Sequence, residues 1–157
     1  MEQNWLKKIP QEKGCYIAGF VDGEGSFNVS LVKRNDYRLK WRVVPIFNVS
    51  QKDITMLFLI KKYLNCGRIQ KRKDGLNMYI VENLTAINER VIPFFKRFNF
   101  LSTTTKTNFS IFCQIIKLLN RQDRLDKDTF VKICQLREKL NKGKGRKRKY
   151  NLSDIRF

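Results

Sequence analysis

The chain has 157 residues and a mass of 18.7 kDa, enough for one domain whose single core buries about two-thirds of the unfolded surface. Hydrophobic residues make up 42% of the chain, with only 8 glycines and 3 prolines, which excludes collagen-like and wholly disordered proteins. Lys and Arg outnumber Asp and Glu by 33 to 14, and the net charge of +19 predicts a polyanionic partner.

The first predicted helix lies between Pro10 and Gly25. Proline is common in the first turn of a helix, and glycines at 23 and 25 are expected to end it. The spacing of apolar residues predicts a stripe that faces the core and consists of Cys15, Tyr16, Ile17, Phe20 and Val21.

A hairpin is predicted after this helix. Apolar and polar residues alternate from Phe27, a polar turn is expected at Asn35 and Asp36, and a second strand is expected over 38–49. Because alternate side chains of a strand share a face, one face of this hairpin should be apolar and the other polar.

The next segments repeat this order. Ser50 and Asp53 form a capping-box pattern for an amphipathic helix that ends near Gly67. A second hairpin is predicted over 68–81, with its turn at Lys73-Asp74-Gly75. Three further helices are expected: one capped by Asn83 or Thr85 and kinked at Pro93, one starting at Thr104 or Thr105, and one opened by Asp126 or Asp128.

The order of helix, hairpin, helix, hairpin and helices predicts an α+β fold with one antiparallel sheet and extra C-terminal helices. A folded domain is expected over 1–141 and a basic tail over 142–157, and the basic run KGKGRKRK at 142–149 is expected to be flexible until bound. The tail is expected to bind phosphates non-specifically, with affinity that falls steeply with salt, and a nuclear-targeting signal is its alternative reading.

The polar face of the sheet is a candidate nucleic-acid surface. Rows of Asn, Gln and Arg have the bidentate geometry that reads purine edges, and a two-stranded ribbon fits a major groove. The alternative is that these side chains only solvate an open face. The candidate DNA-binding residues are Asn28, Ser30, Arg34, Arg38, Lys40, Arg42, Asn48, Arg68, Gln70 and Arg72.

Several chemistries are excluded by what the sequence lacks. There is no His, and the four cysteines form no CxxC pair, so a zinc site and Ser or Cys hydrolase chemistry lack their usual groups. Catalysis would use carboxylates, Lys or a bound ion. The cysteines are expected to be buried free thiols in a reducing compartment, and no secretion signal or membrane span is predicted.

The segment from Ile17 to Gly25 has features that helix stability alone would avoid. Gly19 and Gly23 lie four residues apart, and each costs about 1 kcal/mol relative to Ala within a helix. Asp22 and Glu24 lie at the C-terminal end, where the helix dipole disfavours negative charge. Close approach of a second helix and a bound cation would explain both features. A core helix ending in an acidic turn is the alternative.

The sequence IAGFVDGEG, followed by Ser26 and Phe27, resembles the motif of the LAGLIDADG homing endonucleases, with Ile17 for Leu, Gly23 for Ala and Glu24 for the last Asp. The resemblance covers most of the chain and implies the family's αββαββα core. One motif implies a homodimer, because this family builds its active site from two such helices. The implied dimer interface comprises Ala18, Gly19, Val21, Asp22 and Gly23.

The resemblance also implies site residues. Glu24, with Gly23, would hold a divalent metal, normally Mg²⁺, at the scissile phosphates. Gln51 matches a position that orders water, although an exposed polar residue at a helix start is the alternative. Lys106 lies nearest to the position where the family has a Lys that stabilises charge, but the family position is one residue earlier. The alternative is therefore that Lys106 is an exposed Lys without a catalytic role. Lys52 is the second candidate for the catalytic Lys.

The leading functional interpretation is a site-specific endonuclease that makes a metal-dependent staggered double-strand break in a long pseudo-palindromic DNA target. An RNA maturase that assists splicing of its host intron, and so binds intron RNA, is the alternative, and a DNA-binding regulator with a degenerate site is the third reading. Richness in Lys, Asn, Ile and Phe and the family resemblance together indicate an organelle, either mitochondrion or chloroplast.

Overall fold

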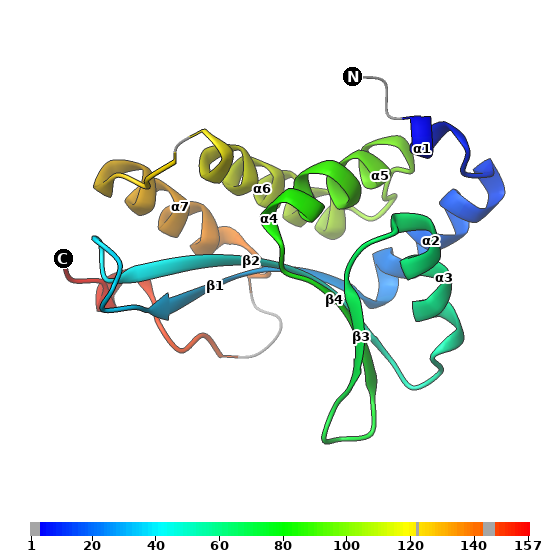
Figure 1. Cartoon of the computed structure of the whole chain (residues 1–157), viewed down its shortest axis with the longest axis horizontal. Coiled ribbons are helices and arrows are strands. Elements are labelled where there is room, and N and C mark those ends of the chain that lie inside the picture. The colour runs from blue at the N-terminus through cyan, green and yellow to red at the C-terminus, as the bar shows by residue number, and fades with distance from the viewer. Residues whose placement is uncertain (1–3, 122, 143–146) are drawn as a thin grey trace. The chain divides into compact units, whose positions relative to one another are not determined.

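The computed structural model describes residues 4–121, 123–142 and 147–157. Helices and strands alternate in the predicted order (Figure 1), which confirms the α+β class. The first half contains α1 (Asn4–Lys7), α2 (Gln11–Glu24), β1 (Gly25–Lys33), β2 (Trp41–Gln51), α3 (Thr55–Leu64), β3 (Arg68–Lys71) and β4 (Asn77–Val81). The second half contains α4 (Leu84–Ala86), the π-helix η1 (Ile87–Val91), α5 (Ile92–Arg97), α6 (Thr103–Asn120), α7 (Lys127–Lys139) and the 3-10 helix η2 (Leu152–Asp154).

The four strands form one sheet in the order β1-β2-β4-β3. β4 pairs antiparallel with both β2 and β3. Directly opposed residues share a face, so the register creates two rows across three strands, Asn48-Ile80-Arg68 and Ser50-Met78-Gln70. The pairing therefore confirms that Asn48, Arg68 and Gln70 share one face, and it adds two apolar side chains between them.

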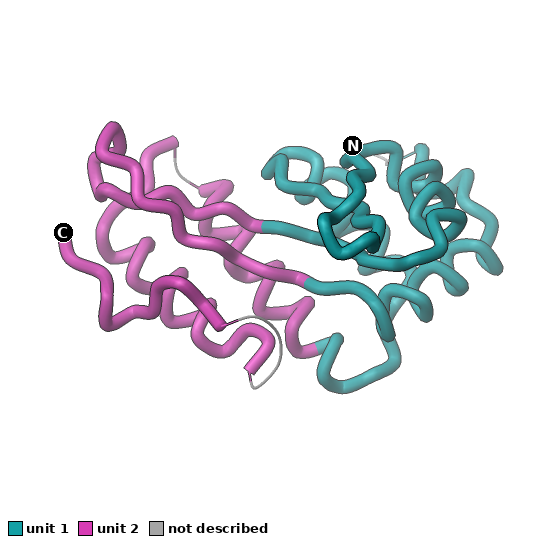
Figure 2. The backbone as a smooth tube through the Cα atoms, turned by 90° about the horizontal axis from the view of Figure 1, so that it is seen from below, with its two compact units in different colours: residues 1–26, 46–106 teal, residues 27–45, 107–157 magenta. Residues whose placement is uncertain are grey.

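The chain divides into two compact units, residues 1–26 with 46–106 and residues 27–45 with 107–157 (Figure 2). The backbone passes between them within β1, β2 and α6. The first unit has a core rich in phenylalanine: the ring of Phe95 lies 5.4 Å from Phe47, 5.0 Å from Phe94 and 4.7 Å from Phe100. Fully buried aliphatic side chains of α2 and α3 complete this core.

The second unit has its own core and protects the edge of the sheet. Leu31, Trp41, Phe130 and Cys134 form a buried cluster. β1 is an edge strand, and unpaired carbonyls at such an edge invite other strands to pair with it. Here the Nε of buried Arg137 donates to the carbonyl of Val29 at 2.6 Å, and Asn141 Nδ2 donates to that of Phe27 at 2.7 Å.

Two local predictions around the first hairpin are wrong. The second strand begins at Trp41 rather than Arg38, because residues 34–40 form a turn closed by a hydrogen bond from Arg34 N to Lys40 O. Arg38 and Lys40 therefore lie in the turn, and Lys40 has a positive φ of 62°. Ser50 caps no helix, because its backbone pairs with Met78 and α3 starts only at Thr55.

The buried face of α2 differs from the predicted stripe. Ile17 and Val21 are buried as expected, but Cys15 and Tyr16 are exposed. Gly14 takes part in the core instead, since a Cβ there would lie 2.2 Å from the Phe98 ring. The helix therefore approaches the end of α5 more closely than any side chain at position 14 would permit.

Two of the three predicted start signals of the later helices are confirmed, whereas α6 begins at Thr103, one residue before Thr104. Asn83 Oδ1 accepts from Ala86 N, and Asp126 Oδ1 accepts from Thr129 N, so both residues are helix caps. The helix after Asn83 continues through η1 into α5, and the expected irregularity at Pro93 is a π-helical segment just before it. The four cysteines are free as predicted, but only Cys134 is buried.

The end of the basic tail, which follows the run expected to be flexible, packs on the core of the second unit. Tyr150 packs edge-on against Trp41 with ring centroids 4.9 Å apart, and Phe157 lies 5.8 Å from Phe130. Leu152 and Ile155 pack on the same buried cluster. Part of the basic run, 143–146, lies outside the described residues. No helix in the described ranges is long and apolar enough to span a membrane.

Candidate active site and nucleic-acid interface

The junction between α2 and β1 presents an unpaired carboxylate. Glu24 is the last residue of α2, and Gly25 begins β1 without a linker. A Cβ at position 25 would lie 2.5 Å from the side chain of Val21 and 2.8 Å from its carbonyl oxygen, so this tight exit needs glycine. Glu24 is exposed and has no hydrogen-bond or ion-pair partner among the residues that the structure describes. Its carboxylate is therefore available to an external cation.

Asp22 has a different role, because it joins α2 to the start of α6. Its Oδ2 accepts from the backbone N–H groups of Leu101 at 3.1 Å and Ser102 at 3.0 Å, and its Oδ1 accepts from the Ser102 hydroxyl. Desolvation opposes ionisation, but hydrogen bonds from Ser102, Thr105 and Leu101 outweigh it and lower the pKa of Asp22 to about 2. The sequence motif does not reveal these partners, which lie about 80 residues away.

We expect the Asp22→Asn substitution to lower the free energy of unfolding by about 1–2 kcal/mol near neutral pH, because an amide cannot accept from all these donors as a carboxylate does. The folded pKa lies below the unfolded one, so this stabilisation is complete above about pH 5 and is lost as the pH falls from about 4 to 2. Urea unfolding of both proteins across this range measures it. The exposed Asp123→Asn variant should match the wild type throughout, and an unchanged stability of Asp22→Asn at neutral pH would contradict the bonding scheme.

Gln51 lies at the end of the sheet where β1 begins. β1 and β2 are neighbours joined by one turn, so the last residue of β2 and the first of β1 lie at the same end. Gln51 Oε1 accepts from Lys52 N at 2.9 Å, and Asn77, opposite Gln51, donates from Nδ2 to Lys52 O at 3.0 Å. Gln51 is thus a strand residue at the Glu24 end of the sheet, rather than a residue of a helix start.

Lys106 lies in the first turn of α6 with an exposed side chain. Its backbone N–H donates to Ser102 O at 3.0 Å, so the Asp22 contacts also fix this turn. Thr105, at the position where the family resemblance expects Lys, donates from its hydroxyl to the carbonyl of Asp22 at 3.3 Å. Lys106 is therefore attached to the same helix junction as Glu24.

Of the residues predicted to form the dimer interface, some are buried in the core of this chain and others are exposed at its surface. Ala18 and Val21 are buried within one chain, with 2% and 0% of their surface exposed, so their side chains face this chain's own core. Gly19 and Gly23 are exposed, and an added Cβ at either would meet no atom of the described chain within 4 Å. Nothing within the described chain therefore requires glycine at these two positions.

The polar face of the sheet retains most of its predicted members. Asn28, Ser30 and Arg42 alternate with buried residues on β1 and β2. Asn28 Oδ1 accepts from Asn141 Nδ2 at 3.0 Å, so its amide is oriented by a residue that follows α7 in the chain. Sequence reasoning missed Met78 and Ile80, because the alternation of β4 is hidden by its burial on both faces.

Among the basic residues predicted to bind DNA, three form ion pairs with acidic residues and others do not. Arg34 contacts Asp36 at 2.9 Å, Arg68 contacts Glu82 at 3.2 Å and Arg72 contacts Asp74 at 2.8 Å. In the described part of the chain, the exposed residues Arg38, Lys40 and Arg42 have no ion-pair partner. Unpaired cations therefore gather at the turn of the first hairpin.

Comparison with known proteins identifies the family. The family model for LAGLIDADG endonucleases matches residues 17–116, from the α2 motif through most of α6. The chain belongs to the LAGLIDADG endonuclease family. The homing endonuclease I-ApeII of Aeropyrum pernix is 31% identical over 149 residues, which cover 89% of this chain and 86% of that protein. Other relatives of the LAGLIDADG chain include fungal proteins named as probable intron-encoded endonucleases.

Solved LAGLIDADG endonucleases share the fold. The archaeal intron-encoded homing endonuclease I-Vdi141I, solved in complex with DNA, superposes with a TM-score of 0.83 at 29% identity and covers 92% of each chain. The meganuclease I-SmaMI bound to uncleavable DNA gives a TM-score of 0.79 at 27% identity, and the match covers 87% of this chain but 47% of that one. These matches confirm the predicted fold family.

The described residues of the LAGLIDADG chain bring few metal-binding groups together. The described residues contain no group of three or more Asp, Glu, Cys or His able to hold a metal ion. Magnesium prefers near-octahedral oxygen coordination that includes one or two carboxylates and several waters. Glu24 is an unpaired carboxylate of this kind, whereas Asp22 is occupied by its contacts with α6. Glu24 therefore fits as one of the carboxylates of a Mg²⁺ site.

Proposed function

We propose that this protein is a homing endonuclease that cuts double-stranded DNA at a specific site. The observation that carries the proposal is the exposed, unpaired Glu24 at the end of the family motif, with Lys106 attached to the same junction and Gln51 at the same end of the sheet. The DNA complexes among its structural relatives support double-stranded DNA as the substrate. Relatives named as intron-encoded endonucleases support an intron-encoded gene, and we propose an organelle as its location.

We propose that the active enzyme is a homodimer formed through the exposed face of α2. Gly19 and Gly23 leave room for the backbone of a second helix, and Tyr16, with 62% of its surface exposed, flanks them on the same helix. The match to about half of the I-SmaMI chain supports two copies of this protein at one DNA site. Identical subunits would read a pseudo-palindromic target, because each presents the same sheet to its half-site.

The proposed chemistry divides roles among this chain's own groups. Glu24 and the Gly23 backbone of each copy would hold a divalent cation, and the bound ion would supply an activated water and charge stabilisation at the scissile phosphates. Gln51 would orient water beside this position. Lys106 would place positive charge near the phosphate, where negative charge develops. Two such sites, one per strand, would give the staggered double-strand break.

The polar sheet face would read the DNA half-site. Asn48 and Gln70 have amides suited to adenine edges, and Arg42 is an unpaired guanidinium suited to guanine. Met78 lies between Ser50 and Gln70 in the sheet register, where its apolar side chain would contact a thymine methyl group. The face thus combines polar and apolar contacts across neighbouring strands.

A randomised DNA library tests the function directly. We expect recurrent staggered cuts within one pseudo-palindromic sequence when Mg²⁺ is present and none after chelation, because phosphodiester hydrolysis without His requires the cation. Sequencing the new ends gives both the target and the stagger. Absence of any recurrent cut with Mg²⁺ or Mn²⁺ would overturn the endonuclease proposal, and metal-independent binding of the host intron RNA would then favour the maturase interpretation.

A further inference from the structure

A pocket opens at the turn end of the first hairpin, entirely within the second compact unit. Its volume is about 410 Å³, and it is lined by Lys33, Asn35, Lys40, Trp41, Asp154 and Arg156. Lys33 ends β1 and Trp41 begins β2, so the pocket lies where these two strands meet the turn of the first hairpin. Three of its lining residues are cations and one is an acid.

Both lysines of the pocket are held in place without neutralisation. Lys33 Nζ lies 5.5 Å from the centroid of the Trp41 ring and 5.3 Å from that of Tyr150. Lys40 Nζ donates to the Asn35 carbonyl at 3.0 Å, and its backbone is fixed by the hairpin turn. In the described ranges of the chain neither lysine has a carboxylate partner. Rings and a carbonyl orient these ammonium groups but leave them a full positive charge.

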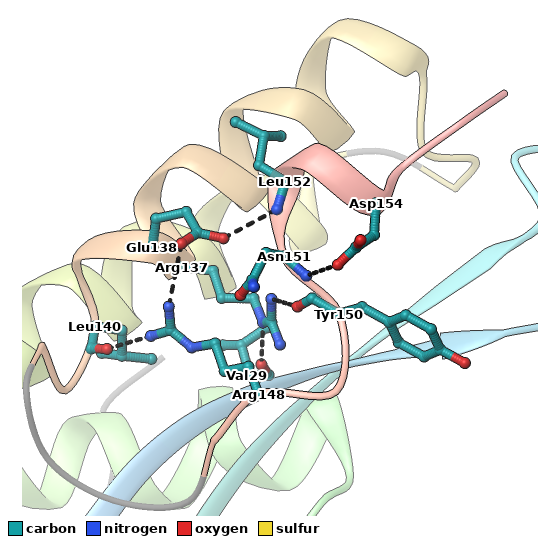
Figure 3. Close-up of polar contacts among 9 residues, drawn as sticks. All are labelled: Val29, Arg137, Glu138, Leu140, Arg148, Tyr150, Asn151, Leu152 and Asp154. Atoms are coloured by element: carbon teal, nitrogen blue, oxygen red, sulfur yellow. Dashed lines mark hydrogen bonds and ion pairs between the residues drawn. The ribbon is translucent and has the colours of Figure 1, made fainter.

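The C-terminal segment supplies the third cation and is anchored before it reaches the pocket (Figure 3). Arg137 Nη1 donates to the Tyr150 carbonyl at 2.8 Å, while its Nε holds Val29 of β1. Glu138 Oε1 accepts from Leu152 N at 3.1 Å. These contacts fix the segment against the same strand that carries Lys33.

The acid in the pocket does not neutralise the arginine. Asp154 Oδ2 accepts from the Asn151 backbone N–H at 2.8 Å and closes the capping box of η2. Arg156 is exposed and has neither a hydrogen bond nor an ion pair with any described residue. The carboxylate therefore orders the turn, and the guanidinium two residues later remains available to a ligand.

We propose that this pocket binds a phosphate group of the DNA backbone. The inference rests on the proposed function, since the DNA is the one bound for cleavage. Ammonium and guanidinium groups suit a phosphate oxygen cluster. Trp41 is 4% exposed as a residue, so its ring offers no open face for base stacking. The contact positions the protein and carries no sequence information.

The salt dependence of DNA binding tests the pocket. The probe is a fluorescent random-sequence duplex DNA, titrated at several salt concentrations with wild type, Arg156→Gln, Lys33→Gln and Arg156→Lys. We expect each Gln variant to bind about 3- to 10-fold more weakly at low salt and to reduce the slope of log affinity against log salt by about 1, because one phosphate contact is lost. Arg156→Lys keeps the charge and should keep the slope.

Two controls decide between the pocket and overall charge. Lys132→Gln removes an exposed cation of α7 outside the pocket and should leave the slope close to that of wild type. Thermal unfolding checks that each variant is folded.

Equal slopes of log affinity against log salt for wild type and both pocket variants would overturn the inference, as would an equal loss of slope in Lys132→Gln. Stabilisation by inorganic phosphate alone, with unchanged DNA slopes, would instead indicate a free-anion site and also overturn it. Metal-dependent cutting by the wild type is scored separately, so the endonuclease proposal stands or falls on its own result.

Discussion

Substituting Glu24 with Gln should abolish DNA cleavage while leaving DNA binding intact. The amide keeps the size of the side chain but loses the charge that would hold a divalent cation in the proposed site. We expect cleavage to fall by a factor of about 10³ or more, equivalent to about 4 kcal/mol in the activation barrier. Binding should change less than about threefold, because the sheet and the basic turn are untouched. Stability should not fall, because Glu24 is exposed, has no partner in the described chain and carries a charge that the helix dipole disfavours.

The same helix supplies a matched control. Glu12 lies exposed in the first turn of α2, so Glu12→Gln removes the same charge from the other end of the helix and should cut like wild type. Co-expression adds a test of a shared site: mixed dimers of wild type and Glu24→Gln should lose double-strand cutting, whereas mixtures with Glu12→Gln should keep it. A Glu24→Gln protein that cuts at the wild-type rate would exclude Glu24 as the metal ligand.

The sequence predicts those parts of the fold that depend on short-range interactions. Asn83 and Asp126 cap helices because each side chain reaches a backbone N–H three residues ahead. Gly75 has a φ of 87° and lies in the predicted turn of the second hairpin. Ser50 shows the limit of such signals, because its local capping pattern loses to strand pairing with β4. Long-range pairing therefore overrides a local preference that sequence alone cannot weigh.

In the candidate site, too, the sequence predicts what depends on a local motif and misses what depends on long-range contacts. The family motif indicates Glu24, but the partners of Asp22 come from the start of α6, about 80 residues away. The packing of the C-terminal segment was unpredictable for a similar reason. Arg137 is buried and donates to the Val29 carbonyl 108 residues away, whereas the composition of 142–157 indicated only a basic tail. A buried arginine with carbonyl acceptors has no local sequence signature.

The second large effect is expected at Gly19. If two copies pack through the exposed face of α2, a bulky side chain there would separate the helices, and Gly19→Phe should weaken the dimer by about 100-fold or more. The monomer should remain folded, because a Cβ at this position points into open space. Replacing Gly within a helix also adds helix propensity of about 0.5 kcal/mol. Cleavage should fall with dimerisation, since each copy brings one Glu24.

Sedimentation velocity at micromolar concentration, with and without DNA, measures the association. Gln135→Phe places the same side chain on the exposed surface of α7 and should leave the dimer intact, which separates a local clash from added hydrophobicity. Gly14→Ala should instead destabilise the fold itself, because the added methyl group would lie 2.2 Å from the ring of Phe98. A wild-type protein that stays monomeric even on DNA would refute packing through α2. A Gly19→Phe variant that still dimerises would also refute it, because the added side chain would then meet no second helix.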